Sequence, residues 1–179
     1  ITDFPTIQIQ IDQDGNYDVI SSYYDRLYTK LHQLVDNTED LKECIVNYVT
    51  STQIIEVVDA NIKTTATLNG FDLINCKAEG IFENCFFVGT EITNSQMNKC
   101  KLQHSDATNS KVLNCKVEAS TLENCYFMEG YLNGDMFGGV YRSGTLGPYA
   151  TLDSEVKIVT DDGNFFDTKF DSEIKGETK

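Results

Sequence analysis

The sequence has little basic charge, which excludes generic binders of the phosphate backbone. Fourteen Lys and Arg residues stand against 28 Asp and Glu residues, giving a formal net charge of −14 over 179 residues. A protein that neutralises nucleic acid needs a surplus of clustered bases. We therefore expect no direct binding to nucleic acid.

Long hydrophobic runs and a secretory signal pattern are also missing. No window comes near the roughly 18 apolar residues of a membrane-spanning helix. The first residues lack a basic stretch followed by an apolar core. The composition, 40% hydrophobic and 23% charged, is that of a globular chain. We expect a soluble protein with no membrane partner.

Histidine is scarce, with His32 and His104 as its two positions. Neither stands at a spacing that combines a nucleophile, a base and an orienting group. The sequence also lacks the Cys-x-x-Cys and short Cys–His spacings of zinc sites, and a glycine-rich phosphate loop after an expected strand. We expect no catalytic residue, no metal site and no cofactor, and hence a protein that is not an enzyme.

A five-residue register fills the middle of the chain. Twelve successive positions spaced by five are apolar, from Phe82 to Phe137, and a small residue stands two places before each of the first eleven. Neither a helix nor an alternating strand produces a period of five. Upstream the same pairing is out of phase, which indicates that one residue was lost between Ala78 and Phe82.

The unit of a small residue, a variable residue, a central apolar residue and two further variable positions resembles the pentapeptide-repeat family. The resemblance covers about residues 66–137. It implies a right-handed β-helix with four sides, about twenty residues per coil and three to four coils, stacked because so short a unit cannot bury its own side chain. The solenoid core would comprise Phe82, Phe87, Ile92, Met97, Leu102, Val112, Val117, Leu122, Phe127 and Leu132.

Five of the six cysteines occupy the small position of the repeat, and Cys44 lies outside it. With twenty residues per coil, Cys85 and Cys125 lie two coils apart, a separation of about 9.6 Å. A disulfide needs Cα atoms within about 7 Å. We therefore expect free, buried thiols and a reducing compartment such as a cytoplasm.

Residues 1–65 are expected to form a β-hairpin followed by helices. Apolar residues in steps of four and three predict an amphipathic helix over residues 18–35. Its seam would either cap the solenoid or drive oligomerisation, and consists of Ile20, Tyr24, Leu27, Leu31 and Leu34. Thr38 is typical of the cap of a second helix, which would carry Leu41, Ile45 and Tyr48 and end near Val49, before a strand at residues 53–58.

Turn signals mark both ends of the chain. Ile7, Ile9 and Ile11 alternate with polar residues, and Asp14-Gly15 predicts a tight turn toward Tyr17 and Val19. The acidic segment 12–18 does not fit an EF-hand, because its glycine is fourth rather than sixth. Residues 138–179 predict a short β-hairpin around residues 162–164 and a polar tail.

Two functions fit these features. The first is a structural or assembly protein, in which the rigid solenoid serves as a spacer or contact surface for other subunits or for a second copy, in a particle such as a virion. The second, implied by the family resemblance, is an acidic mimic of duplex DNA that binds DNA gyrase or topoisomerase. The net charge is −7 over residues 1–65, −4 over 66–137 and −3 over 138–179. We favour the first function, because mimicry would concentrate acidity on the repeats.

Overall fold

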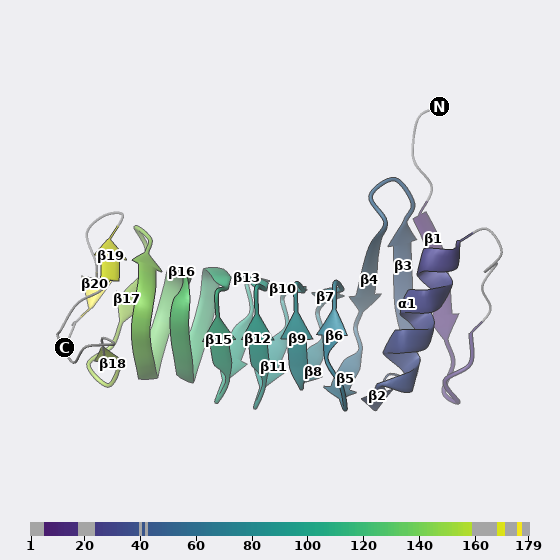
Figure 1. Ribbon diagram of the computed structural model, residues 1–179. Helices are drawn as coiled ribbons and strands as arrows, with labels where there is room; N and C mark the ends of the chain where they lie inside the picture. Colours follow the sequence, from purple (N-terminus) through teal and green to yellow (C-terminus); the bar gives the residue numbers. More distant parts are fainter. Residues whose placement is uncertain are drawn as a thin grey trace.

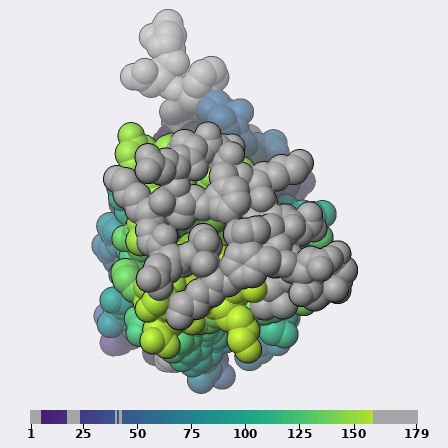
Figure 2. Space-filling view, turned by 90° about the vertical axis from the view of Figure 1, so that its left-hand side faces the viewer, coloured from purple at the N-terminus to yellow at the C-terminus, as the bar shows by residue number. Residues whose placement is uncertain are grey.

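The computed structural model describes residues 6–17, 24–39, 41, 43–158, 168–170 and 175–176. These residues form a mainly β protein, a β-solenoid of about seven turns with a single short helix. The stacked coils make one rod (Figure 1). When the rod is viewed along its axis from the C-terminal end, the coils lie behind one another (Figure 2). The solenoid is confirmed, but the expected three to four coils are wrong.

Each coil contains three strands, and three parallel faces therefore run along the rod. Face A consists of β4 (Ile54–Val58), β7 (Asp72–Ile74), β10 (Phe86–Val88) and β13 (Lys101–Gln103). Face B consists of β5 (Asn61–Thr64), β8 (Lys77–Glu79), β11 (Glu91–Thr93) and β14 (Asp106–Thr108). Face C consists of β6 (Leu68–Asn69), β9 (Ile81–Glu83), β12 (Gln96–Asn98) and β15 (Lys111–Leu113). The continuous strand β16 (Lys116–Leu146) extends all three faces.

Stacked coils lie about 15 residues apart in the chain, so the expected four-sided coil of twenty is wrong. Phe87 pairs with Leu102, and Phe82 pairs with Met97, in each case one coil further along. One earlier coil is shorter by a single position, since Leu73 pairs with Phe87. This shortening is the phase shift seen in the sequence. Three five-residue units, rather than four, return the chain to its starting face.

The corners explain why five residues make one side. From Phe82 to Phe127, the residue two places after the central apolar residue adopts a positive φ. Asn is the commonest type there, as at Asn94 (φ 48°), Asn109 (φ 52°) and Asn124 (φ 52°). Asn tolerates this left-handed conformation better than most side chains. The next position is small and buried. Its backbone N–H groups and hydroxyls link the coils, as where Thr90 N–H donates to Ser105 Oγ at 3.2 Å.

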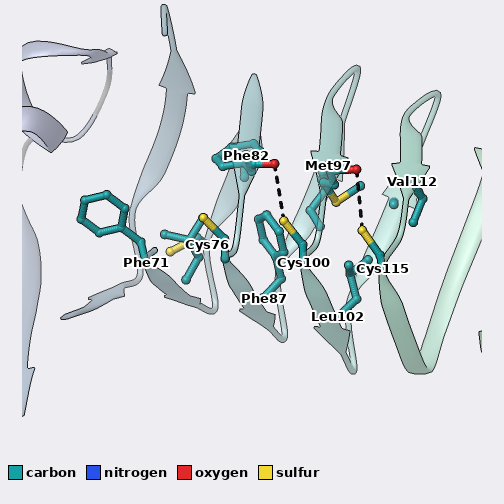
Figure 3. Close-up of a cluster of buried hydrophobic side chains, with 14 of the residues drawn as sticks. Phe71, Cys76, Phe82, Phe87, Met97, Cys100, Leu102, Val112 and Cys115 are labelled. Carbon is teal, nitrogen blue, oxygen red and sulfur yellow. Dashed lines mark hydrogen bonds between the residues drawn. The ribbon is translucent and has the colours of Figure 1, made fainter. Parts of the chain in front are cut away.

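The interior is continuous and apolar. Phe82, Met97 and Val112 lie in one column, with Phe87 and Leu102 in the neighbouring one (Figure 3). The ten expected core residues, Phe82, Phe87, Ile92, Met97, Leu102, Val112, Val117, Leu122, Phe127 and Leu132, are all 0% exposed. Near the end of the repeat the register shifts: Phe137 is 43% exposed, and Met136 turns inward instead.

The N-terminal region closes one end of the rod with a helix and antiparallel strands. Face A continues through β3 (Cys44–Val49) and β1 (Thr6–Ile11), while β2 (Thr38–Glu39) pairs with β5. Helix α1 (Asp25–Asp36) packs here, and its Lys30 ammonium lies 4.8 Å from the Phe71 ring centre. No helix among the described residues has the length and apolar character needed to cross a membrane.

The second expected helix is wrong. Ile45 and Tyr48 lie in strand β3 instead, Leu41 lies between β2 and β3, and β3 is paired on both sides. Leu41, Ile45 and Tyr48 follow a helical spacing, but Cys44, Val46 and Tyr48 also alternate and are buried. Because two neighbouring strands satisfy the backbone, the alternating pattern prevails.

The turn at Asp14-Gly15 forms, but the expected hairpin toward Tyr17 does not. Gly15 has φ 84°, and the Asp12 carboxylate accepts hydrogen bonds from the backbone N–H groups of Asp14 (2.9 Å) and Asn16 (2.8 Å). Asn16 and Tyr17 belong to no strand, and β1 pairs with the distant β3. Val19 lies outside the described residues.

The C-terminal strands extend the solenoid beyond its expected end at residue 137. At the other end, β4 and β5 extend it ahead of its expected start at residue 66. They are β17 (Thr151–Leu152), β18 (Lys157–Ile158), β19 (Thr168–Phe170) and β20 (Lys175–Gly176). The first three pair in parallel with β16, and β20 pairs with β17. The expected turn at residues 162–164 lies outside the described residues.

We expect Gly139→Ala to destabilise the protein more than Gly15→Ala. Both glycines have positive φ, which costs a side chain about 1–2 kcal/mol. An added Cβ meets nothing within 4 Å at Gly15, but lies 2.2 Å from the Cys125 carbonyl oxygen at Gly139. Urea unfolding should therefore show a loss of about 2–3 kcal/mol for Gly139→Ala and about 1–2 kcal/mol for Gly15→Ala. Equal losses would contradict close stacking at this corner.

Candidate interaction surfaces

The outward positions of the strands give each face its own chemistry. On face A, aliphatic residues follow one another across four neighbouring strands, in the register Ile45, Val58, Ile74 and Val88. All four are half-buried on the surface of the sheet. We call this row the aliphatic ladder.

Charged and aromatic side chains flank the aliphatic ladder. The neighbouring row of face A runs through Glu56, Asp72, Phe86 and Lys101. The Lys101 ammonium lies 5.3 Å from the Phe86 ring centre. Burial, with a smaller contribution from the Glu56 carboxylate, raises the pKa of Asp72 to about 6. A negative charge on Asp72 is therefore unfavourable at neutral pH.

We expect Asp72→Asn to stabilise the protein at pH 7 and to change little at pH 4. The raised pKa means that the folded state binds this proton more tightly than the unfolded state, whose Asp pKa is near 3.8. The resulting stability is fully present below about pH 4 and is lost as the pH rises through about 6. Urea unfolding at both pH values measures the difference, with Asp106→Asn on face B as control. A destabilised Asp72→Asn at pH 7 would contradict the expectation.

Face B is acidic over its middle coils. Glu91, Asp106, Glu123 and Asp135 occupy successive coils, and no Lys or Arg stands on the outward positions of this face between Lys77 and Asp153. A depression of about 430 Å³ lies over the middle of the face, lined in part by Glu91, Asp106 and Glu123. The lysines that dilute the charge of the repeats in the sequence belong mostly to the other two faces and to the corners.

The outward-pointing aromatics Phe86, Tyr126 and Tyr131 are half-buried and do not form a common patch. Phe86 and Tyr131 belong to face A but lie three coils apart, and Tyr126 lies on face C. Sequence spacing could not show this, because faces can be assigned only once the coil length is known. The aliphatic ladder was missed for the same reason, since its members do not recur at one constant interval.

The cysteines form a column that differs from the expected arrangement. Cys85, Cys100 and Cys115 occupy the same corner on consecutive coils, about 4.8 Å apart. The expected separation of two coils is therefore wrong, and distance alone does not prevent a disulfide. All six thiols are nevertheless free and buried. Cys100 Sγ donates to the Phe82 carbonyl oxygen at 3.5 Å (Figure 3).

We expect none of the six thiols to react quickly with a disulfide reagent in the folded protein. Burial raises the pKa of Cys44 to about 12, and the hydrogen bond with Cys115 together with burial raises the pKa of Cys100 to about 12. The hydrogen bond with Cys100 lowers the pKa of Cys115, but this side chain is 1% exposed and a reagent cannot reach it in the folded protein. Only the thiolate attacks such a reagent. Ellman titration at pH 8 should detect no thiol before unfolding and all six in guanidinium chloride. One rapidly reacting native thiol would contradict this.

The residues of the expected seam contribute to the closed end of the rod. Leu27, Leu31 and Leu34 are 0% exposed, and Tyr24 makes an edge contact with Tyr48 at 5.8 Å between ring centres. Ile20 lies outside the described residues. Among the residues that the structure describes, no group of three or more His, Cys, Asp or Glu side chains is arranged to hold a metal ion. His32 instead lies 3.1 Å from Asp36 on the exposed side of α1.

Comparison with known proteins adds no relative: no family model, curated protein or solved structure matches the chain.

Proposed function

We propose that this chain is a non-enzymatic structural or assembly protein whose solenoid is a rigid spacer that presents face A to other protein subunits. The aliphatic ladder carries the proposal. Four aliphatic side chains in register on the surface of one face are costly to leave in water and suit a protein contact. A larger particle such as a virion is a suitable setting, and the buried free thiols suit assembly in a cytoplasm.

The solenoid supports the spacer role. About seven coils at about 4.8 Å each give a rod of about 34 Å. Its apolar columns are unbroken, so each coil is fixed by both neighbours. Such a body can hold partners at a constant separation because bending it would open the packed interior.

We also infer that the chain is a divergent member of the pentapeptide-repeat class with the right-handed winding of that class. The five-residue unit supports this, with one inward central residue, one left-handed corner and one small buried residue on each side. The chain departs from that class in its coil length, because each coil contains three five-residue units instead of four. An experimental structure that showed left-handed winding would reject the assignment.

Site-specific photocrosslinking in the native source tests the assembly function. A benzophenone amino acid at Val88 lies in the aliphatic ladder, and the same group at Thr93, on face B of the neighbouring strand β11, is the control. We expect a discrete protein adduct from Val88 and a much weaker one from Thr93. No adduct at Val88, or equal adducts at both positions, would reject face A as the contact surface.

A second candidate is the DNA mimic, which the carboxylates of face B favour. Charge density decides against it as the first choice. One carboxylate per coil gives one negative charge per about 4.8 Å, whereas duplex DNA carries one per about 1.7 Å of its axis. A gyrase supercoiling assay tests this candidate directly. Inhibition that is lost in a variant with Glu91, Asp106 and Glu123 all changed to Gln would establish it over the assembly function.

A further inference from the structure

The charged row of face A, which runs beside the aliphatic ladder, separates its charges by sign along the rod. Its two acids, Glu56 and Asp72, lie on β4 and β7. Its two bases, Lys101 and Lys116, lie on β13 and β16. Phe86 stands between the two groups on β10, a strand near the middle of the rod (Figure 1). Acids and bases are therefore placed one and two coils away from the same aromatic residue, on opposite sides of it.

Neither acid of the charged row has a base of its own. Among the described residues, no Lys, Arg or His side chain lies within ion-pair distance of the Glu56 or Asp72 carboxylate. Asp72 is half-buried, and its raised pKa shows that its charge is poorly compensated within the chain. Lys101 and Lys116, by contrast, are exposed. A partner surface with bases at the spacing of the acids, and acids at the spacing of the bases, would complement this row.

The outward side of face A is left uncovered by the N-terminal helix. Tyr24, at the start of α1, contacts the ring of Tyr48 on β3. The Tyr48 side chain is buried and alternates along β3 with the outward Asn47. Helix α1 therefore lies on the inner side of this sheet. The chain is described without a gap from residue 43 to residue 158, which includes β3 to β15 and all of β16.

We propose that face A binds face A of a second copy of this chain, with the two rods antiparallel about a twofold axis at Phe86. This inference rests on the proposed assembly function and names its partner. An axis that runs along the strand direction, between the two faces, reverses the order of the coils and keeps the charged row opposite itself. Asp72 then faces Lys101 of the second copy, and Glu56 faces Lys116. Each contact occurs twice, on either side of a central pair of Phe86 rings.

Charge selects this register over the one that would overlap the aliphatic ladders most. The latter has its axis between β4 and β7, and it would place Glu56 opposite Asp72 of the second copy, an unfavourable contact of like charges. With the axis at β10, Val88 of one ladder faces Val88 of the other. Glu118 faces the ladder of the second copy, but it is already paired with Lys116 of its own chain at 3.2 Å.

The size of the contact indicates a reversible dimer. Seven neighbouring strands of face A are centred on β10, from β3 to the part of β16 that begins at Tyr131. Seven strands span about 29 Å, and one five-residue side is about 17 Å wide. The overlap is therefore about 500 Å² per copy, or about 1,000 Å² in total, at the lower limit for a specific interface.

Charge reversal tests the pairing in sedimentation equilibrium of the full chain at up to about 100 µM. We expect a monomer–dimer equilibrium for the wild type. Asp72→Lys and Lys101→Asp should each associate at least about tenfold more weakly, since each places like charges opposite each other. An equimolar mixture of the two variants should recover association to within about threefold of the wild type. The reason is that their heterodimer again places opposite charges together at both contacts.

The matched controls make the same charge changes away from face A. They are Asp106→Lys on face B and Lys111→Asp on face C, both at exposed positions, and both should dimerise like the wild type. Circular dichroism of each variant shows whether the solenoid is intact. If Asp72→Lys does not fold, Asp72→Asn takes its place and should weaken association about threefold by removing the charge. Unfolding of dilute protein follows the monomer, so the stabilisation expected above for Asp72→Asn does not depend on the pairing.

Three outcomes overturn the pairing: a wild-type monomer throughout this range, single reversals that associate like their controls, or a mixture of folded variants that stays monomeric. The assembly function is judged separately by the Val88 crosslink, which the pairing predicts to join two copies of this chain. A wild-type monomer whose Val88 adduct contains another protein rejects the self-pairing alone. The absence of any Val88 adduct rejects face A as the contact surface altogether.

Discussion

Replacing Phe87 with Ala should lower the free energy of unfolding by about 3–5 kcal/mol. Phe87 is 0% exposed and lies between Leu73 and Leu102 of the adjacent coils. Its ring contacts Phe82 edge-on, with 5.2 Å between centres. The shortened side chain leaves a cavity that these neighbours cannot fill, because backbone ladders fix the coil spacing. Urea or guanidinium unfolding followed by circular dichroism measures the loss.

Phe86→Ala is the matched control, since the same change is made one residue earlier on the same strand. Phe86 points outward on face A and is half-buried, so its loss removes surface packing and the contact with Lys101. We expect a cost of about 1 kcal/mol or less. Equal losses at the two positions would contradict the assignment of Phe87 to the packed interior.

The five-residue register predicted the solenoid because each unit brings one apolar residue inward. Coil length is a separate property, and the register alone does not fix it. A signal for coils of three units was present: Cys85, Cys100 and Cys115 recur at every third unit, and so do Asn94, Asn109 and Asn124. Apolar residues occupy every inward position, so columns that joined every fourth unit looked as consistent as the true columns, which join every third.

The ends were less predictable because tertiary pairing decides their structure. The segment around Ile45 and Tyr48 satisfies both a helical and an alternating pattern, and it becomes a strand only because β1 and β4 lie on its two sides. The aliphatic ladder was hidden for a related reason. Coils of unequal length must be aligned before Val58, Ile74 and Val88 form one row. Neither feature follows from local sequence.

Replacing Leu31 with Asp should destabilise the protein by at least about 4 kcal/mol, because it buries an unpaired charge. Leu31 is 0% exposed between Leu27 and Leu34 on the buried side of α1. Displacing α1 would uncover the apolar end of the solenoid, so we also expect large aggregates in light scattering. Thr29→Asp adds the same charge on the exposed side of α1 and should unfold within about 0.5 kcal/mol of the wild type. A soluble Leu31→Asp variant with an unchanged unfolding midpoint would show that the solenoid folds without its helix. If helix and solenoid instead unfold together in this variant, they form one cooperative unit.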